Sequence, residues 1–299
     1  MKTVKEIREI MGNVSFCAVD AHVHTHLCDG APDMTVENIA QKAESEGMQA
    51  VILTPHFHKH VSDETHAMYP DSDEDIFIEL RKEIDAYHKN YPGKVTVLLS
   101  TEADILDAKG HTALTLTEKG EQALDFVTPT VNYHPLLPLK AVSLTSGMTI
   151  VDTYESGAAQ KYLDGFGGTA EVLKSLYEAE TNAISACPYP AMVGHFLAAH
   201  SSLFGYNWFD AKPEHLELMK EGAGKLIGVC AEKGAMIDAT GIQMKGLNFE
   251  EKAKADGFLC DFQKWFLKRC KEKNVLVFPG SDAHNMSAVG DVAYYQTLI

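Results

Sequence analysis

Short apolar runs alternate with amphipathic segments along most of the chain. Each apolar run is rich in Val, Ile, Leu and Phe and ends in polar residues, as buried parallel strands do. The predicted strands are residues 15–25, 49–57, 94–105, 124–134, 191–198, 235–241 and 275–284. Apolar positions recur at helical spacing in the predicted helices, which are residues 36–46, 76–90, 170–186, 213–234 and 256–274. Seven strands interleaved with helices predict a parallel sheet, either open or closed.

One segment interrupts this alternation. Residues 135–169 follow the fourth predicted strand and carry neither pattern. We expect this inserted segment to cover or shape a site, as long excursions of this kind often do. The chain has no Pro-, Gly- or Ser-rich linker and no internal repeat, so residues 1–299 are predicted to form a single domain.

The composition is that of a soluble globular protein, with 45% apolar and 23% charged residues. No apolar run approaches the ~20 residues that cross a bilayer, and the N-terminus lacks the apolar core of a secretory signal. The six cysteines include no CxxC pair, which favours reduced thiols. We therefore expect a cytoplasmic protein without a membrane partner.

The charge balance is strongly acidic. The formal net charge is −16, and the only arginines are Arg8, Arg81 and Arg269. Proteins that bind nucleic acids carry basic surfaces that neutralise phosphates, so this balance argues against a nucleic-acid partner. A small phosphorylated metabolite stays compatible with it, because bound divalent cations can supply positive charge. The sequence makes no prediction about the oligomeric state.

Residues with metal-binding side chains lie at the carboxyl ends of six of the seven predicted strands. They are His22, His24, Asp29, His56, Glu102, His134, His195, Asp282 and His284. Because the carboxyl ends of parallel strands meet at one face, we expect these side chains to lie close together. In the pairs His22/His24 and Asp282/His284 both side chains point to one side, since side-chain direction on a strand repeats every two residues.

Imidazole and carboxylate groups in this number suit two or three divalent transition metal ions, namely zinc, iron or manganese. A single histidine at a strand end is more often an ordinary hydrogen-bonded residue than a ligand. The prediction therefore depends on the joint placement of the whole set. Among the other histidines, His26 and His58 are the ones that we expect to approach the site, because each follows a candidate ligand by two residues.

The motifs that contain these residues resemble those of the PHP (polymerase and histidinol phosphatase) metal-dependent phosphoesterases, and within them the histidinol-phosphatase-like branch. The segments concerned are DAHVHTHLCDG (20–30), ILTPHF (52–57), STEADI (100–105), VNYHP (131–135), MVGHF (192–196) and PGSDAHN (279–285). The resemblance spans residues 20–292. It implies a distorted, TIM-like (β/α)7 barrel with a metal site at the carboxyl ends of the strands.

The resemblance also implies how three metals would be held. The first would take His22, His24, Glu102 and Asp282, the second Glu102, His134 and His195, and the third Asp29, His56 and His284. Asp20 would orient a ligand imidazole. A metal-bridging hydroxide would attack the phosphorus of a small phosphomonoester. Asp282 or His284 would be the catalytic residue that assists proton transfer to the leaving group.

Two features depart from the family pattern. Cys28 stands where the family often has serine, and no arginine lies between Arg81 and Arg269. Histidinol phosphatases of this branch are expected to hold the phosphate with arginines on inserted segments. The lysines that could replace them include Lys140, Lys161 and Lys245. Because lysine offers a point charge rather than a planar fork, the resemblance predicts the reaction class better than the substrate.

Two other interpretations stay open at the level of sequence. An amidohydrolase-type metal hydrolase also begins with an HxH motif, but it would leave Asp29 unused and bring a lysine rather than Glu102 to the metals. A non-catalytic metal-binding PHP domain would keep the fold without the activity. The intact set of candidate ligands argues against that second interpretation.

Overall fold

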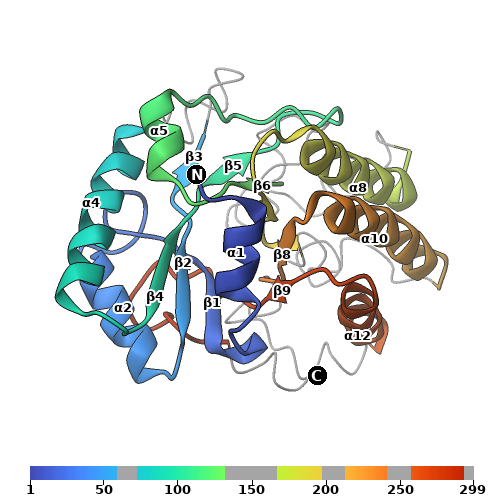
Figure 1. Cartoon of the computed structure of the whole chain (residues 1–299). Coiled ribbons are helices and arrows are strands. Elements are labelled where there is room, and N and C mark those ends of the chain that lie inside the picture. Colours follow the sequence, from blue (N-terminus) through green and yellow to red (C-terminus); the bar gives the residue numbers. More distant parts are fainter. Residues whose placement is uncertain (59–72, 132–166, 197–212, 241–256, 293–299) are drawn as a thin grey trace, which may run out of the picture.

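The computed structural model describes residues 1–58, 73–131, 167–196, 213–240 and 257–292 (Figure 1). The strands are β1 (Val19–Val23), β2 (Ala50–Leu53), β3 (His56–Phe57), β4 (Thr96–Leu99), β5 (Glu102–Asp104), β6 (Thr128–Thr130), β7 (Met192–Val193), β8 (Met236–Asp238) and β9 (Val277–Phe278). The helices are α1 (Val4–Met11), η1 (Phe16–Ala18, 3₁₀), α2 (Val36–Ser45), α4 (Asp75–Asn90), α5 (Glu118–Ala123), α8 (Thr169–Ala186), α10 (Pro213–Lys233) and α12 (Gly257–Glu272). All pairings between these strands are parallel, so the predicted α/β class is confirmed.

The strands form three parallel sheets, in the orders β1-β2-β4, β3-β5-β6 and β7-β8-β9. The chain continues from β2 into β3 and from β4 into β5, which links the first two sheets. A bridge between Val127 and Ala191 joins the segments of β6 and β7. Another bridge joins Val23 of β1 to Ala283, which follows β9. The chain itself therefore links the first two sheets, and one parallel bridge links each of them to the segments around the third.

The observed strands are shorter than the predicted ones. Predicted strand 49–57 is divided into β2 and β3 at Pro55, because proline has no N–H to donate across the sheet. The carbonyl oxygen of Pro55 instead accepts the N–H of Glu102 at 3.0 Å. Predicted strand 15–25 begins as η1, and the pairing of β1 changes register between Asp20 and Val23. An irregularity of this kind redirects side chains, and it is common beside active sites.

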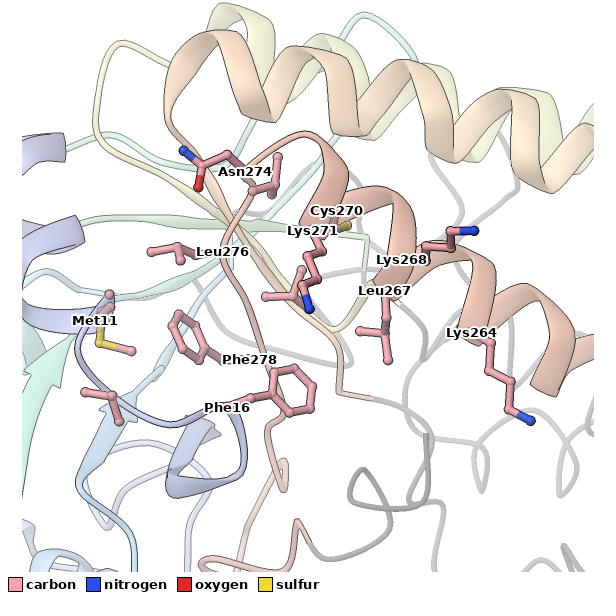
Figure 2. Close-up of a pocket in the computed structure, with 14 residues that line it drawn as sticks. Met11, Phe16, Lys264, Leu267, Lys268, Cys270, Lys271, Asn274, Leu276 and Phe278 are labelled. Carbon is pink, nitrogen blue, oxygen red and sulfur yellow. The ribbon is translucent and has the colours of Figure 1, made fainter. Parts of the chain in front are cut away.

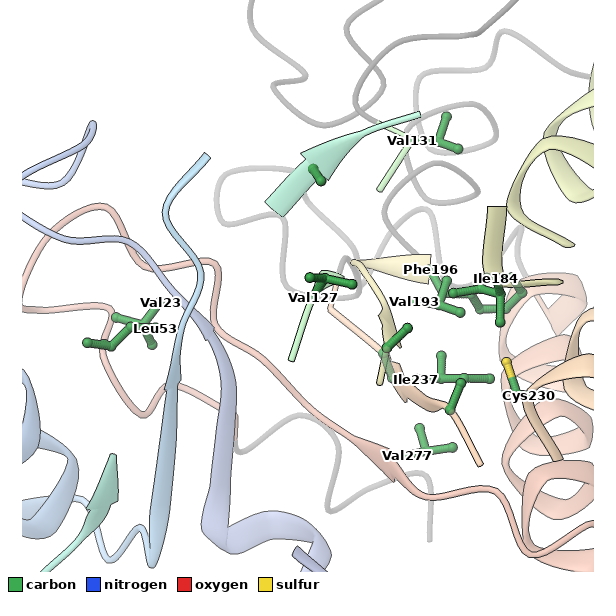
Figure 3. Close-up of a cluster of buried hydrophobic side chains, with 14 of the residues drawn as sticks. Val23, Leu53, Val127, Val131, Ile184, Val193, Phe196, Cys230, Ile237 and Val277 are labelled. Atoms are coloured by element: carbon green, nitrogen blue, oxygen red, sulfur yellow. The ribbon is translucent and has the colours of Figure 1, made fainter. Parts of the chain in front are cut away.

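Alternate residues of the strands pack into two hydrophobic clusters. One cluster joins one face of the strands to α1 and contains Ile7, Met11, Val19, Ala21, Ala50, Ile52, Leu98, Phe126, Met192, Met236 and Phe278. The intervening residues belong to the other cluster, in which Val193 and Ile237 pack with Ile184 of α8 and Cys230 of α10 (Figure 3). Since the cluster with α1 includes the first residues of several strands, α1 covers their amino ends. The carboxyl ends carry the candidate ligands.

The helices surround the strands on two sides. Figure 1 shows α2, α4 and α5 on one side and α8, α10 and α12 on the other. Of the predicted insertion 135–169, residues 135–166 lie outside the described part of the chain. Gly167 and Gly168 lead into α8 with φ values of 86° and 95°, a conformation that glycine adopts without strain. No helix in the described ranges combines the length and apolarity needed to cross a membrane.

Candidate metal centre

Eight of the nine predicted ligands lie together at the carboxyl ends of the strands. His22 belongs to β1, His56 begins β3 and Glu102 begins β5. The others occupy the segments that follow β1, β7 and β9, and they are His24, Asp29, His195, Asp282 and His284. His134 falls outside the described residues, so its role stays a prediction.

Among the described carboxylates, Glu102 faces the largest number of imidazoles. Its Oε1 lies 2.7 Å from His195 Nε2. Its Oε2 lies 3.1 Å from His22 Nε2, 3.1 Å from His56 Nδ1 and 3.5 Å from His24 Nε2. Burial raises the pKa of Glu102, but the facing imidazoles outweigh burial and hold its pKa well below the usual range. Glu102 is therefore ionised at neutral pH although its side chain is only 1% exposed.

Asp29 gathers a second set of imidazoles. Its Oδ1 lies 2.9 Å from His24 Nδ1, and its Oδ2 lies 3.0 Å from His56 Nε2 and 2.9 Å from His284 Nε2. Burial works against ionisation of Asp29, but the imidazoles, His24 foremost, hold its pKa well below its usual range. Asp282 extends the set, since its Oδ1 lies 3.0 Å from His24 Nε2.

Four imidazoles have oxygen atoms beside both of their ring nitrogens. They are His22, His24, His56 and His284. A neutral imidazole has one N–H, so it can donate toward one of the two oxygens only. Its other nitrogen then faces an oxygen lone pair with a lone pair of its own. A second proton or a metal ion resolves that contact, and this set of nitrogen and oxygen atoms fits divalent transition metals.

If protons alone resolved these contacts, several buried imidazoles would have to be charged. Burial lowers the pKa of His22, but Asp238 and Glu102 outweigh burial and raise it to about 10. For His24 burial is likewise outweighed by the facing carboxylates, which raise its pKa well above the usual value. For His56 burial prevails and lowers the pKa. Metal ions compete with these protons, so the affinity for metal is expected to increase with pH.

The ligand atoms form three overlapping groups, and within each group all atoms lie within 4.8 Å of one another. The groups are His24/Asp29/His56/His284, His22/His24/Asp282 and His22/Glu102/His195. The set implied by the resemblance for one metal, Asp29 with His56 and His284, is found together, and His24 joins it. Because His22 and His24 each belong to two groups, the distances alone do not divide the ligands among separate ions.

Asp238 is a functional candidate that the sequence analysis missed. Its Oδ2 lies 2.8 Å from His22 Nδ1 and accepts the backbone N–H of His195 at 2.9 Å. Its Oδ1 accepts the N–H and the hydroxyl of Thr240. Asp238 therefore holds one imidazole ring and the backbone of another candidate ligand. The available signal was its place in the sixth predicted strand, residues 235–241, to which no ligand was assigned; in the structure Asp238 is the last residue of β8.

The expectation that Asp20 orients an imidazole is wrong. The carboxylate of buried Asp20 accepts the N–H and hydroxyl of Ser281 at 2.8 and 2.7 Å and the N–H of Gly290 at 2.8 Å. These donors belong to the segment around Asp282, so Asp20 fixes that segment against β1. The family resemblance implied an imidazole contact, but the carboxylate faces the donors of Ser281 and Gly290, and the contact that it makes with His22 is to the backbone N–H, at 3.4 Å.

We expect Asp20→Ala to lower the free energy of unfolding by about 2–4 kcal/mol, because it leaves several buried donors without an acceptor. Chemical denaturation of the variant and the parent chain measures this difference. Asp33→Ala provides the control, since Asp33 is exposed. A loss below about 0.5 kcal/mol for Asp20→Ala would show that the segment around Asp282 is held by other contacts.

Of the two further histidines that were expected to approach the site, one does so and the other does not. His58 stacks on His56 with ring centroids 4.5 Å apart, and its Nδ1 lies 2.7 Å from Asp104 Oδ2. His26 instead lies beside Glu83, with Nε2 3.3 Å from Oε1. His58 therefore adjoins the candidate metal centre, whereas His26 is paired with a carboxylate of α4.

Comparison with known proteins identifies the class to which this fold and site belong. The family model of the PHP domain matches residues 20–240, and the chain therefore belongs to the PHP domain family. The match includes β1 to β8 and all the predicted ligands except Asp282 and His284.

The chain is similar to histidinol phosphatases. It is 23% identical over 286 residues to the histidinol-phosphatase of Bacillus subtilis (strain 168), covering 92% of this chain and 95% of that protein. The solved structure of a Listeria monocytogenes protein assigned as a histidinol phosphatase has a TM-score of 0.61 at 14% identity, over 93% of this chain and 99% of that one. A histidinol phosphate phosphatase from Lactococcus lactis subsp. lactis, complexed with zinc, L-histidinol and phosphate, has a TM-score of 0.54 at 14% identity, over 95% and 93%. At this level of identity the solved structures show a shared fold.

Proposed function

We propose that this chain is a metal-dependent phosphoesterase that hydrolyses a small phosphomonoester, with histidinol phosphate as the leading substrate. The observation that carries the proposal is the set of buried imidazoles whose two ring nitrogens both face oxygen atoms. Membership of the PHP family and the similarity to the Bacillus histidinol-phosphatase support the reaction class. The Lactococcus enzyme is complexed with zinc and phosphate, which supports a role for metal ions in binding the phosphate group of the substrate.

Two or three divalent transition metals, zinc, iron or manganese, would be held by His22, His24, Asp29, His56, Glu102, His195, Asp282 and His284, with His134 as the ninth ligand. When bound, such ions lower the pKa of water and neutralise phosphate oxygens. The chain itself holds the ring of His22 between Glu102 and Asp238, so that its orientation is set before substrate arrives.

Asp282 and His284 are the residues that we propose for proton transfer to the leaving alkoxide. Their side chains are 28% and 42% exposed, whereas Glu102 and the imidazole of His22 are buried. Asp282 has a φ of 52°, an uncommon conformation for a non-glycine residue that is often associated with functional constraint. Its N–H donates to the carbonyl oxygen of His22 at 2.9 Å, which fixes the carboxylate relative to the ligands.

We infer that the three sheets are parts of one distorted (β/α)7 barrel. The parallel bridges at Val127–Ala191 and Val23–Ala283 support this inference, because they connect the sheets in sequence order and return to β1. The cluster shared with α1 supports it as well, since β1, β2, β4, β7, β8 and β9 all contribute residues to it. A barrel would place all the candidate ligands around one opening.

The geometry is less compatible with an amidohydrolase-type site. Asp29, which such a site would leave unused, lies within 3.0 Å of nitrogens of His24, His56 and His284. Glu102, where such a site would bring a lysine, faces the largest number of imidazoles among the described carboxylates. Both carboxylates support the phosphoesterase instead.

A panel of phosphomonoesters tests the proposed substrate. The chain, supplemented separately with zinc, iron or manganese, is assayed for phosphate release from histidinol phosphate, an aryl phosphate and several sugar phosphates. We expect kcat/KM for histidinol phosphate to exceed that for the aryl phosphate by about a hundredfold or more. Equal values would reject histidinol phosphate as the substrate. A metal-loaded chain that releases no phosphate from any ester would contradict the activity itself.

We expect Asp238→Asn to weaken metal binding by about 10–100-fold while activity returns at saturating metal. The carboxylate of Asp238 now faces His22 Nδ1 and accepts the backbone N–H of His195. The amide of asparagine would replace one carboxylate oxygen by an N–H₂ donor, so the ring of His22 would lose its orientation. Titration of the metal-stripped variant, followed by activity, measures both quantities. A variant whose kcat stays low at saturating metal would show that Asp238 has a role beyond orienting the ligands.

A further inference from the structure

A pocket of about 570 Å³ is lined by residues none of which is a candidate metal ligand (Figure 2). It is formed between α1, η1, α12 and β9, and its apolar lining includes Met11, Val14, Phe16, Leu267, Leu276 and Phe278. Both residues of β9, Val277 and Phe278, line the pocket, whereas Asp282 and His284 follow β9 along the chain and are not part of the lining. The volume is typical of sites for small molecules.

The charged residues that line this pocket are all basic within the described part of the chain. They are Lys264, Lys268 and Lys271, which share one face of α12. Helix α12 carries four basic and two acidic residues, whereas the whole chain carries 26 basic and 42 acidic ones. In Figure 2 the amino group of Lys271 points toward the space beside Leu267, Phe16 and Phe278, while Lys264 and Lys268 extend along the helix.

We propose that this pocket binds an amphipathic monoanion, namely a carboxylate attached to an alkyl chain. The alkyl chain would pack against Phe16, Leu267 and Phe278, and the carboxylate would lie beside Lys271. Charge complementarity favours this class, because Lys264, Lys268 and Lys271 border an apolar lining on a chain whose net charge is −16. A neutral apolar ligand would gain nothing from the lysines. The site is independent of the proposed phosphoesterase activity.

Calorimetric titration of the full chain with hexanoate, octanoate and decanoate tests the proposal. We expect each added methylene group to tighten binding by about fourfold per group until the pocket is filled. We expect n-octanol to bind about fivefold more weakly than octanoate at low ionic strength, with the difference decreasing as salt is added. No measurable binding of decanoate, or equal binding of octanol and octanoate at low salt, would overturn the proposal.

Variants locate the site. Lys271→Ala should lower the affinity for octanoate about fivefold and make it equal to the affinity for octanol. Lys273 is also an exposed lysine but lies outside the pocket lining, so Lys273→Ala should change neither affinity. Val14→Trp should abolish binding by filling the pocket, with an unchanged circular dichroism spectrum. Asp282→Asn should bind octanoate as the parent chain does. Octanoate binding can then be tested independently of the proposed phosphoesterase activity. Unchanged octanoate binding by Val14→Trp would show that octanoate binds outside this pocket. A dimer of the parent chain that Val14→Trp dissociates would show that a second copy of the chain occupies the pocket. Either result would overturn the proposal.

Discussion

Replacing Glu102 with glutamine is expected to lower phosphoesterase activity by more than about a thousandfold and to remove most of the bound metal. The carboxylate of Glu102 lies within 3.5 Å of nitrogens of His22, His24, His56 and His195. Glutamine has nearly the same shape but only one oxygen, no charge and an N–H₂ group that would face the imidazole of a ligand. Metal analysis after gel filtration and the rate of phosphate release measure the two effects.

Glu180→Gln is the matched control for this experiment. Glu180 is also a buried glutamate, but it lies on α8, and burial raises its pKa well above the usual value. Burial therefore favours the neutral form of Glu180, which glutamine resembles, and we expect metal content and activity to stay unchanged. If Glu102→Gln retained the metal and the activity of the parent chain, Glu102 would not be a ligand.

Replacing Asp282 with asparagine is expected to lower kcat by about a hundredfold or more without unfolding the chain. Asparagine tolerates the φ of 52° at this position, so the substitution removes the charge and leaves the backbone unstrained. The carboxylate oxygen that now lies 3.0 Å from His24 Nε2 and 3.7 Å from His22 Nε2 would lose its charge. Steady-state kinetics with the best ester and a thermal unfolding curve separate loss of activity from loss of stability.

Asp107→Asn serves as the control for Asp282→Asn. Asp107 is also paired with a histidine, with Oδ2 2.7 Å from His111 Nδ1, but this pair is exposed and lies outside the ligand groups. Its replacement should change kcat by less than about twofold. Equal activity in both variants and the parent chain would remove Asp282 from the site.

The spacing of apolar residues was sufficient to predict the α/β class and most of the helices. Residues 213–234 were predicted as a helix and α10 is Pro213–Lys233, because proline at the start and glycine after the end mark both limits. The break between β2 and β3 coincides with Pro55, which is visible in the sequence, whereas the break between β4 and β5 involves a partner far along the chain. At that second break the hydroxyl groups of Ser100 and Thr128 lie 2.6 Å apart.

Position at a strand end was sufficient to bring the candidate ligands together, because parallel strands place their carboxyl ends on one face. It did not indicate which carboxylate faces which imidazole, and the partners of Asp20 and Asp238 therefore emerged only from the structure. Burial raises the pKa of the Cys28 thiol, and an interaction with His24 partly offsets this effect. No contact within the described part of the chain explains why cysteine occupies that position.

The metal content of the purified chain, measured together with its activity, tests the central claim most directly. The chain is stripped with a chelator, reloaded with zinc, iron or manganese, passed through gel filtration and analysed by atomic emission. We expect two or three ions per chain, loss of phosphate release on stripping and its return on reloading. A reloaded chain that retains no metal, or one that hydrolyses phosphomonoesters equally well after stripping, would contradict it.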